Sequence, residues 1–371
     1  MSRADDQREG RAGGGRRRSL GAGYRPALDG VRAVAVLAVM AHHFEPTLTG
    51  GFLGVDVFFV LSGYLITTLL VDEHQLRGRI SVGRFYARRG LRLIPALAPL
   101  FAVVAILWSL HPYPATFGPI GSALAVIAYV GNWVVAASHD GLGYLSHTWS
   151  LAIEEQFYLL WPVLFMWAMR RAPLGRIGGV LLGLVVLIGV LRATGWAILG
   201  TTALLYATPT RSDGLLLGCA LALALRAAPD LAVWRVVRRP AIGWLAGGAL
   251  LVLFVLVAEP LPFPYLGGVS ASVAAAGALL AHLELAPAGL LARALAVRPL
   301  AAIGRISYGL YLFHYPVALF LYQPVDRTPT TFALKLGLSF ALATDSYLLI
   351  ERPALRLKNR FRPDAPALAT A

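Results

Sequence analysis

Residues 29–67 read DGVRAVAVLAVMAHHFEPTLTGGFLGVDVFFVLSGYLIT, and they contain the first two long apolar runs of the chain. The first of these runs is interrupted by a charge, Arg32, and ends on His42 and His43. The eleven positions from Arg32 to His43 make about three helical turns plus 20°, so both side chains share one face, about 16 Å apart. An arginine in an apolar span normally faces a protein interior or a wet cavity. The stretch therefore predicts a membrane helix with a polar stripe.

The composition of the whole chain is that of a membrane protein. Its 371 residues are 57% hydrophobic and only 14% charged, whereas soluble proteins are about 25% charged. The formal net charge is +14 and comes mostly from arginine. We assign these arginines to cytoplasmic loops, following the positive-inside rule, and not to nucleic-acid binding. The single cysteine, Cys219, excludes an intrachain disulfide and a cysteine-rich metal site.

The apolar runs predict an all-α, polytopic membrane bundle of about ten transmembrane helices. The expected spans are residues 27–43, 52–71, 91–110, 148–169, 178–197, 212–225, 241–257, 266–283, 300–322 and 331–350. Residues 119–138 are nearly long enough to span but contain Gly121, Gly131 and Asn132. If they spanned, later basic loops would lie outside the cell. A re-entrant segment at 119–138 instead puts every strongly basic loop in the cytoplasm, which the positive-inside rule favours.

This topology places both termini in the cytoplasm and divides the chain into three parts. Residues 1–24 are expected to be a disordered basic tail, 25–352 the membrane domain, and 353–371 a cytoplasmic tail. The first tail has no apolar h-region, so it is not a cleavable signal peptide. High Ala, Gly and Arg contents indicate a bacterial protein, which predicts the bacterial plasma membrane as its location.

Several polar residues collect at the outer ends of the expected helices. They are His43, His147, Trp149, Glu154, Glu155, Arg211 and Asp213. Helix capping explains any one of them alone. The pair Glu154 and Glu155 is harder to explain in this way, because a carboxylate inside an apolar run is costly without a partner. Adjacent residues cannot face the same way on a helix, so we expect one to face the bundle and the other a cap or partner.

Six blocks of the sequence resemble the acyltransferase-3 family of integral membrane acyltransferases. They are the Arg-x10-His opening with GGFLGVDVFFVLSGYLIT, then RFYARRGLRLIPAL, HTWSLAIEEQFYLLWP, TRSDGLLLG, GRISYGLYLFHYP and the closing ERP. They occur in the family's order between Asp29 and Pro353, so the resemblance covers nearly the whole chain. It implies a membrane-bound O-acyltransferase that moves an acyl group, expected to be acetyl, from acyl-CoA to a hydroxyl on a carbohydrate, a cell-envelope glycan or a glycosylated metabolite.

The resemblance also suggests roles for individual residues. The family's Arg/His motif falls on Arg32 and His43 and makes His43 the general base, which fits the near-neutral pKa of imidazole. His42 lies about 100° round the helix and is expected to be structural. Glu154 or Glu155 would orient the base or hold the acceptor. His147, Trp149, Arg211 and Asp213 are the expected acceptor-binding residues, and Arg211 has the alternative of pairing with Asp213.

The donor site is expected at the cytoplasmic face. Arg89 and Arg92 match the family's paired-arginine motif, and guanidinium forks suit the phosphates of coenzyme A. His314 and Tyr64 are expected along the acyl-CoA tunnel. The alternative for His314 is a hydrogen-bonded histidine in the core. We expect Ser62, Gly63 and Tyr64 mainly to let helices pack closely, and only secondarily to line the tunnel. The donor is acetyl-CoA or another acyl-CoA, and no metal is expected.

Two other functions compete with the enzyme. A transporter of a charged solute would use Arg32 and the glutamates as its binding site, but we see no internal repeat of the kind that transporters show. A non-catalytic membrane partner would not need intact Arg32, His43, Arg89, Arg92 and Glu154. The partners that the enzyme hypothesis predicts are acyl-CoA, a glycosylated acceptor and the lipid bilayer.

Overall fold

The computed structural model describes residues 24–44, 48–138, 140–258, 262–322 and 328–357. The described residues form helices and contain no strand, which confirms the all-α prediction. The expected tails lie outside these ranges except for Tyr24 and residues 353–357, the latter in the last described helix. The first half of the bundle contains α1 (Pro26–Phe44), α2 (Gly54–Arg77), α3 (Val82–Leu110), α4 (Gly118–Ile127), α5 (Gly131–Ala137), α6 (Trp149–Met169) and α7 (Leu174–Tyr206).

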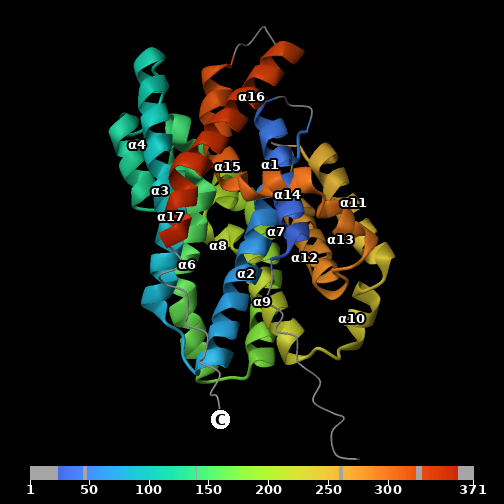
Figure 1. Ribbon diagram of the computed structural model, residues 1–371. Helices are drawn as coiled ribbons and strands as arrows, with labels where there is room; N and C mark the ends of the chain where they lie inside the picture. Colours follow the sequence, from blue (N-terminus) through green and yellow to red (C-terminus); the bar gives the residue numbers. More distant parts are fainter. Residues whose placement is uncertain (1–23, 45–47, 139, 259–261, 323–327, 358–371) are drawn as a thin grey trace, which may run out of the picture.

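The second half contains α8 (Thr208–Arg211), α9 (Asp213–Ala227), α10 (Ala232–Val237), α11 (Pro240–Leu256), α12 (Val269–Leu285), α13 (Leu290–Leu295), α14 (Arg298–Arg305), α15 (Ser307–Phe320), α16 (Pro329–Ser346) and α17 (Arg352–Leu357). Short 3-10 turns, η1 (Gly51–Leu53) and η2 (Gly143–Thr148), precede α2 and α6. Two π turns, η3 (Pro264–Gly268) and η4 (Tyr347–Glu351), adjoin α12 and α16. Figure 1 shows α1 and α2 in the middle, with α3, α4 and α6 on one side and α10 to α13 on the other.

The helices have the lengths and surfaces of a polytopic membrane bundle. Within the described residues, six continuous helical stretches are long and apolar enough to cross a bilayer. The remaining expected spans correspond to α6, which carries a polar Glu-Glu-Gln run, and to α9, α11 and α15, which are shorter than 18 residues. Large apolar side chains such as Val163, Val186 and Leu245 are exposed on the outside of the bundle, as lipid contact requires.

Residues 118–137 form two short helices instead of one span. The ten residues of α4 reach only about 15 Å, half the hydrocarbon thickness. The chain then breaks at Tyr129, which has a φ of 55°, before α5 begins at Gly131. The side chain of Gln156 on α6 holds this break by donating to the Tyr129 carbonyl (2.7 Å) and to Asn132 (2.9 Å). This geometry matches the expected re-entrant segment.

Some helix boundaries differ from the sequence expectation. The segment between the expected spans 52–71 and 91–110 is only a turn at 78–81, closed by Gly78 in the left-handed region (φ 69°). Arginine is a good helix former, so α3 extends back to Val82 and carries Arg84, Arg88, Arg89 and Arg92 on its first turns. The expected span at 300–322 is broken at Ile306 into α14 and α15.

Glycines allow the central helices to approach closely. A side chain at Gly63 or Gly218 would collide with the backbone of the partner helix, Gly63 against Leu215 and Gly218 against Val60. This contact locks α2 against α9. The expectation that small residues near Ser62 pack helices together is therefore matched by the structure.

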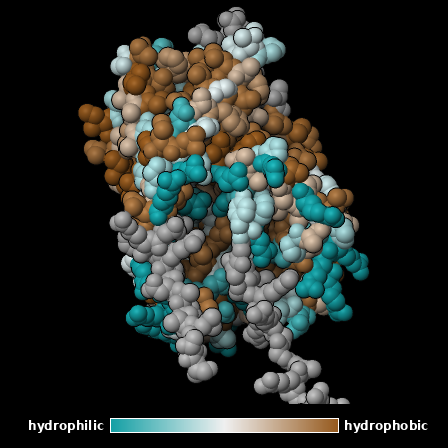
Figure 2. Space-filling model, viewed as in Figure 1, coloured by the Kyte–Doolittle hydropathy of each residue, from teal (hydrophilic) through white to brown (hydrophobic). Residues whose placement is uncertain are grey.

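Polar and apolar surfaces are separated along the bundle. Figure 2 shows brown, hydrophobic side chains over the upper part of the visible face and teal, hydrophilic side chains across its middle and lower part. The upper part holds α4 and the end of α1 that carries His43, and the lower part holds the α2–α3 turn. A line from the α2–α3 turn to His43 therefore runs through the bundle from one end to the other.

Candidate functional site

A cavity of about 770 Å³ enters the bundle between α2, α3, α6 and α15. Gln75, Leu76 and Arg77 line its mouth at the end of α2, and Phe58, Ser150 and Tyr311 line its deep end. Five arginines but only three carboxylates face it, so its lining is net positive. The arginines are Arg32, Arg77, Arg88, Arg89 and Arg92, and the carboxylates are Asp72, Glu73 and Glu154. A cationic, partly apolar cavity of this size suits an anionic ligand with a long arm.

The arginines of the cavity differ in how fully they are paired. Arg32 binds Asp29 one turn earlier on α1 (3.0 Å), and Arg88 binds Glu73 (3.3 Å). Arg89 lies over the ring of Tyr158 (3.7 Å) and 3.7 Å from Glu155. Arg92 makes no ion pair or hydrogen bond to any residue that the structure describes. Arg92 is thus the guanidinium in this cavity with the most unused donors.

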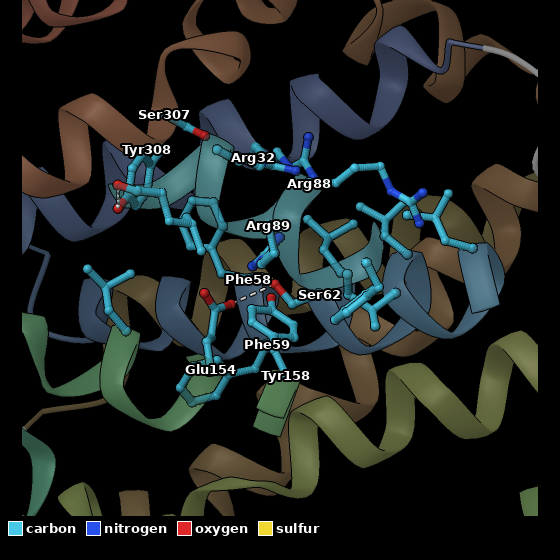
Figure 3. A pocket seen from close by; sticks show the side chains of 18 of the residues that line it. Arg32, Phe58, Phe59, Ser62, Arg88, Arg89, Glu154, Tyr158, Ser307 and Tyr308 are labelled. Carbon is cyan, nitrogen blue, oxygen red and sulfur yellow. Dashed lines mark hydrogen bonds between the residues drawn. The ribbon is translucent and has the colours of Figure 1, made fainter. Parts of the chain in front are cut away.

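The middle of the cavity contains a close polar contact between α2 and α6. The Ser62 hydroxyl donates to Glu154 at 2.6 Å, and Figure 3 shows Arg89 and Tyr158 converging on the same point. The structure separates the adjacent glutamates as helical geometry requires. Glu154 faces the cavity, whereas Glu155 is buried and faces Arg89 on α3.

The deep end of the cavity is closed by Tyr311 on α15. Its hydroxyl donates to the His147 carbonyl (2.8 Å) and accepts from Ser150 (2.6 Å). Its ring also contacts the rings of His147 (5.6 Å between centroids) and His314 (5.4 Å). Tyr311 therefore has the cavity on one side and a set of histidines on the other.

We call His42, His43, His147 and His314 the histidine cluster, and all four lie beyond the cavity lining. His43 Nδ1 lies 3.2 Å from His314 Nε2 and 2.9 Å from the Val39 carbonyl. Tyr315 stacks on His147 (5.0 Å between centroids) and meets His43 edge-on at the same separation. His43 is half-buried, and no described residue engages its Nε2 in a hydrogen bond.

His147, in the η2 turn, is a neutral imidazole with one unused nitrogen. Burial, reinforced by the nearby His43, lowers the pKa of His147 to about 3. Its Nε2–H donates to the Leu312 carbonyl (3.1 Å), while Nδ1 is buried without a partner among the described residues. An unpaired buried acceptor is costly unless a ligand or water supplies a donor. His147 therefore offers a position for a hydroxyl group.

Arg211 and Asp213, expected at the acceptor site, lie in buried ion pairs of the bundle. Arg211 pairs with Asp56 on α2 (3.0 Å), and Asp213 pairs with Arg192 on α7 (2.6 Å). None of these side chains is more than 1% exposed. The alternative pairing of Arg211 with Asp213 is thus replaced by two pairs to other helices. Trp149 links this network to the site, because its ring lies 5.5 Å from the Arg211 guanidinium.

The structure also locates the remaining sequence candidates and adds new ones. Tyr64 is packed in the hydrophobic core and His314 in the histidine cluster, and neither lines the cavity. Asp56, Arg192 and Tyr311 were not singled out from the sequence. Single charges inside apolar runs would have indicated Asp56 and Arg192. The described residues contain no group of three or more His, Cys, Asp or Glu side chains that could hold a metal ion.

Comparison with known proteins finds a matching family and several similar proteins. The model of the acyltransferase-3 family, described as an acyltransferase domain, matches residues 25–348. The chain is 35% identical over 346 residues to the O-acetyltransferase OatA of Staphylococcus aureus, covering 89% of this chain and 57% of that protein. It is 36% identical over 353 residues to the peptidoglycan O-acetyltransferase OatA of Listeria monocytogenes, covering 89% and 56%.

A third relative is the putative peptidoglycan O-acetyltransferase YrhL of Bacillus subtilis, 36% identical over 361 residues, with 89% of this chain and 55% of that protein covered. The chain thus spans little more than half the length of these relatives. No solved structure matches the chain.

Proposed function

The chain belongs to the acyltransferase-3 family, and we propose that it is an O-acyltransferase that takes an acetyl group from acetyl-CoA and esterifies a hydroxyl of a cell-envelope glycan. The observation that carries the proposal is the arrangement of the cavity and the histidine cluster. A cationic cavity runs from the α2–α3 end of the bundle to Tyr311, and the cluster that contains His43 lies directly behind Tyr311.

The cavity is the proposed donor site. The phosphates of coenzyme A are multiply charged and would bind near the mouth and at Arg92, which has unused donors. The neutral pantetheine arm suits the deeper lining of Phe58, Phe59 and Leu65. The thioester then points toward Ser150 and Tyr311 at the deep end. In this arrangement Arg89 holds Glu155 and Tyr158 in place.

His43 is the proposed general base. Its Nε2 takes the proton of the acceptor hydroxyl while the hydroxyl oxygen forms a bond to the thioester carbonyl carbon. The carbon–sulfur bond then breaks, the thiolate leaves, and the proton on His43 passes to the sulfur. The unpaired Nδ1 of His147 supports this reaction by accepting a hydrogen bond from a second hydroxyl of the acceptor. Tyr311 must turn aside for the thioester to reach His43, since it separates the two.

The acceptor class follows from the relatives and from the position of His43. Two relatives are named for O-acetylation of peptidoglycan, a glycan outside the plasma membrane. His43 ends α1 at the opposite end of the bundle from the α2–α3 turn. If the basic α2–α3 end is cytoplasmic, as the positive-inside rule favours, both termini are cytoplasmic and the histidine cluster faces the cell wall.

The function can be tested with purified protein in detergent or nanodiscs. Acetyl-CoA is added with soluble, de-O-acetylated peptidoglycan fragments, free thiol is measured, and the fragments are analysed by mass spectrometry for an ester. We expect thiol release that depends on the fragments and a matching acetyl adduct that mild base removes. Thiol release with no adduct on any offered glycan would contradict the proposed acceptor. Absence of both thiol release and acetyl-CoA binding would contradict the donor.

A further inference from the structure

The mutual arrangement of His43 and His314 fixes which nitrogen of each ring carries the proton. His314 Nδ1 lies 2.8 Å from the Tyr311 carbonyl and 3.1 Å from the Leu310 carbonyl. A carbonyl oxygen can only accept, so this nitrogen must carry a hydrogen. His314 is fully buried, and no ion pair joins it to a carboxylate in the described part of the chain. A charged imidazolium there would be costly, so the ring is neutral and Nε2 holds a lone pair.

That lone pair faces His43. His314 Nε2 lies 3.2 Å from His43 Nδ1, which also lies 2.9 Å from the Val39 carbonyl. Both neighbours of His43 Nδ1 are therefore acceptors, and His43 Nδ1 must be the donor. The opposite assignment would set a lone pair of His314 against two carbonyls and a lone pair of His43 against a third. The proton of a neutral His43 thus sits on Nδ1, and its Nε2 is the basic nitrogen.

We infer that His314 is a positioning residue that holds His43 in the tautomer and orientation with a basic Nε2, and that it accepts a hydrogen bond from the imidazolium that forms when His43 takes a proton. This role resembles that of a carboxylate behind a catalytic histidine, but a neutral imidazole supplies the acceptor. The inference rests on the proposed role of His43. Of the two sequence expectations for His314, it agrees with the hydrogen-bonded core histidine and differs from the residue along the acyl-CoA tunnel.

The location of His314 supports this role over a contact with substrate. It lies outside the cavity lining, and Tyr311, one turn earlier on α15, lies between it and the cavity. Phe44 covers another part of its ring, with 6.4 Å between centroids. A buried ring whose two nitrogens are both engaged has no free group for a substrate.

Two substitutions of His314 distinguish the contact made by its Nε2 from the contacts made by its Nδ1. The amide of glutamine in His314→Gln reaches the position of Nε2 and can still accept from His43. The shorter asparagine in His314→Asn reaches the position of Nδ1 and keeps only the contact with the backbone carbonyls. We expect His314→Asn to lower kcat about 10²-fold or more, with the KM for acetyl-CoA within twofold of the parent. We expect His314→Gln to keep at least tenfold more turnover than His314→Asn.

The same assay separates this inference from the proposed function. If His43→Ala is fully active, the catalytic role of His43 fails and the inference fails with it. If His43→Ala is inactive but His314→Gln and His314→Asn have equal kcat, or differ only in KM, His314 is not a positioning residue and the proposed function stands. Size-exclusion profiles and melting curves of both variants check that they are folded.

A measurement on the unsubstituted protein tests the tautomer directly. The chain has eight histidines, and the His43 signals in ¹⁵N spectra of histidine-labelled protein in bilayers are found by difference from His43→Ala. At a pH where His43 is neutral, we expect the shift of a protonated Nδ1 and an unprotonated Nε2. An unprotonated Nδ1 would overturn the inference regardless of the activity of any variant.

Discussion

The cavity is charged and open, whereas the histidine cluster is neutral and closed, and one side chain, Tyr311, lies between them. The cavity is open at the α2–α3 end and lined by arginines, of which Arg92 has unused donors. The histidine cluster is closed by aromatic rings, and one nitrogen of each of its four histidines meets a backbone carbonyl. The first region is suited to binding a charged molecule from water. The second is suited to holding neutral imidazoles ready to accept protons.

This difference suggests that binding and chemistry are separated in space. Ionic binding needs charge and access to water, whereas a neutral histidine base is favoured by a site from which charge and water are excluded. Tyr311 forms the boundary between the cavity and the histidine cluster, so that ionic binding and a neutral histidine base can coexist. Substitutions in the cavity should therefore change the affinity for the donor, and substitutions in the cluster should change turnover.

The largest expected effect is that of His43→Ala. Removing a general base typically lowers the rate by about 10²–10⁴-fold, and we expect kcat to fall by that factor. The affinity for acetyl-CoA should stay the same, because His43 lies outside the cavity lining. Initial rates of thiol release and a donor-binding titration measure the two quantities.

His42→Ala is the matched control for His43. His42 is the neighbour on the same helix, but its Nδ1 faces the Leu48 carbonyl (3.3 Å) instead of His314. We expect it to keep most of the turnover. Full turnover in His43→Ala together with loss in His42→Ala would reverse the assignment and make His42 the base.

An intermediate effect is expected for Arg92→Ala. A charge-assisted hydrogen bond to phosphate is worth about 1.5–3 kcal/mol, which corresponds to about a tenfold to hundredfold weaker binding of acetyl-CoA. Arg89→Ala should also weaken binding. It should in addition lower the melting temperature, because it leaves the buried Glu155 without its cation.

Donor titration at saturating acceptor, with a melting curve for each variant, distinguishes the two arginines. An unchanged donor affinity in Arg92→Ala and Arg89→Ala would limit these residues to setting the topology of the helix. The cavity would then not be the region that binds the donor.

The smallest expected effect is at the boundary itself. Tyr311→Ala opens the cavity to the histidine cluster, so water that enters from the cavity can reach His43 and attack the thioester. Hydrolysis of acetyl-CoA without acceptor should rise about threefold to tenfold, which corresponds to roughly 1 kcal/mol in the barrier. Tyr311→Phe keeps the ring and loses only the hydroxyl contacts, so its rate of hydrolysis should stay near that of the parent. Equal rates in Tyr311→Ala and the parent would show that Tyr311 is not the boundary.

Relations between residues of the same helix could be predicted from the sequence. Helical periodicity put Arg32 and His43 on one stripe of α1, and it separated Glu154 from Glu155. The basic loops and the glycines of residues 119–138 predicted a re-entrant segment, and the structure has the two short helices α4 and α5 there. These predictions depend on local geometry and on the cost of charge in a bilayer, both of which a single sequence contains.

Contacts between helices distant in the chain could not be predicted in this way. The partners of Arg211 and Asp213 are Asp56 and Arg192, which periodicity cannot identify. The pairing of His43 with His314 joins residues 271 positions apart. Tyr311 forms the boundary on α15, which begins after the break at Ile306 and packs against both η2 and α1. Such pairings are set by the packing of the whole bundle.

The most direct test that donor binding and acetyl transfer occur at opposite ends of the bundle uses proteoliposomes in which the orientation of the protein is known. Labelled acetyl-CoA is placed on one side and membrane-impermeant peptidoglycan fragments on the other. The arrangement predicts acetylated fragments only when acetyl-CoA is on the side of the α2–α3 turn and the fragments are on the side of His43. Acetylation that requires acetyl-CoA and fragments on the same side would contradict transfer across the bilayer.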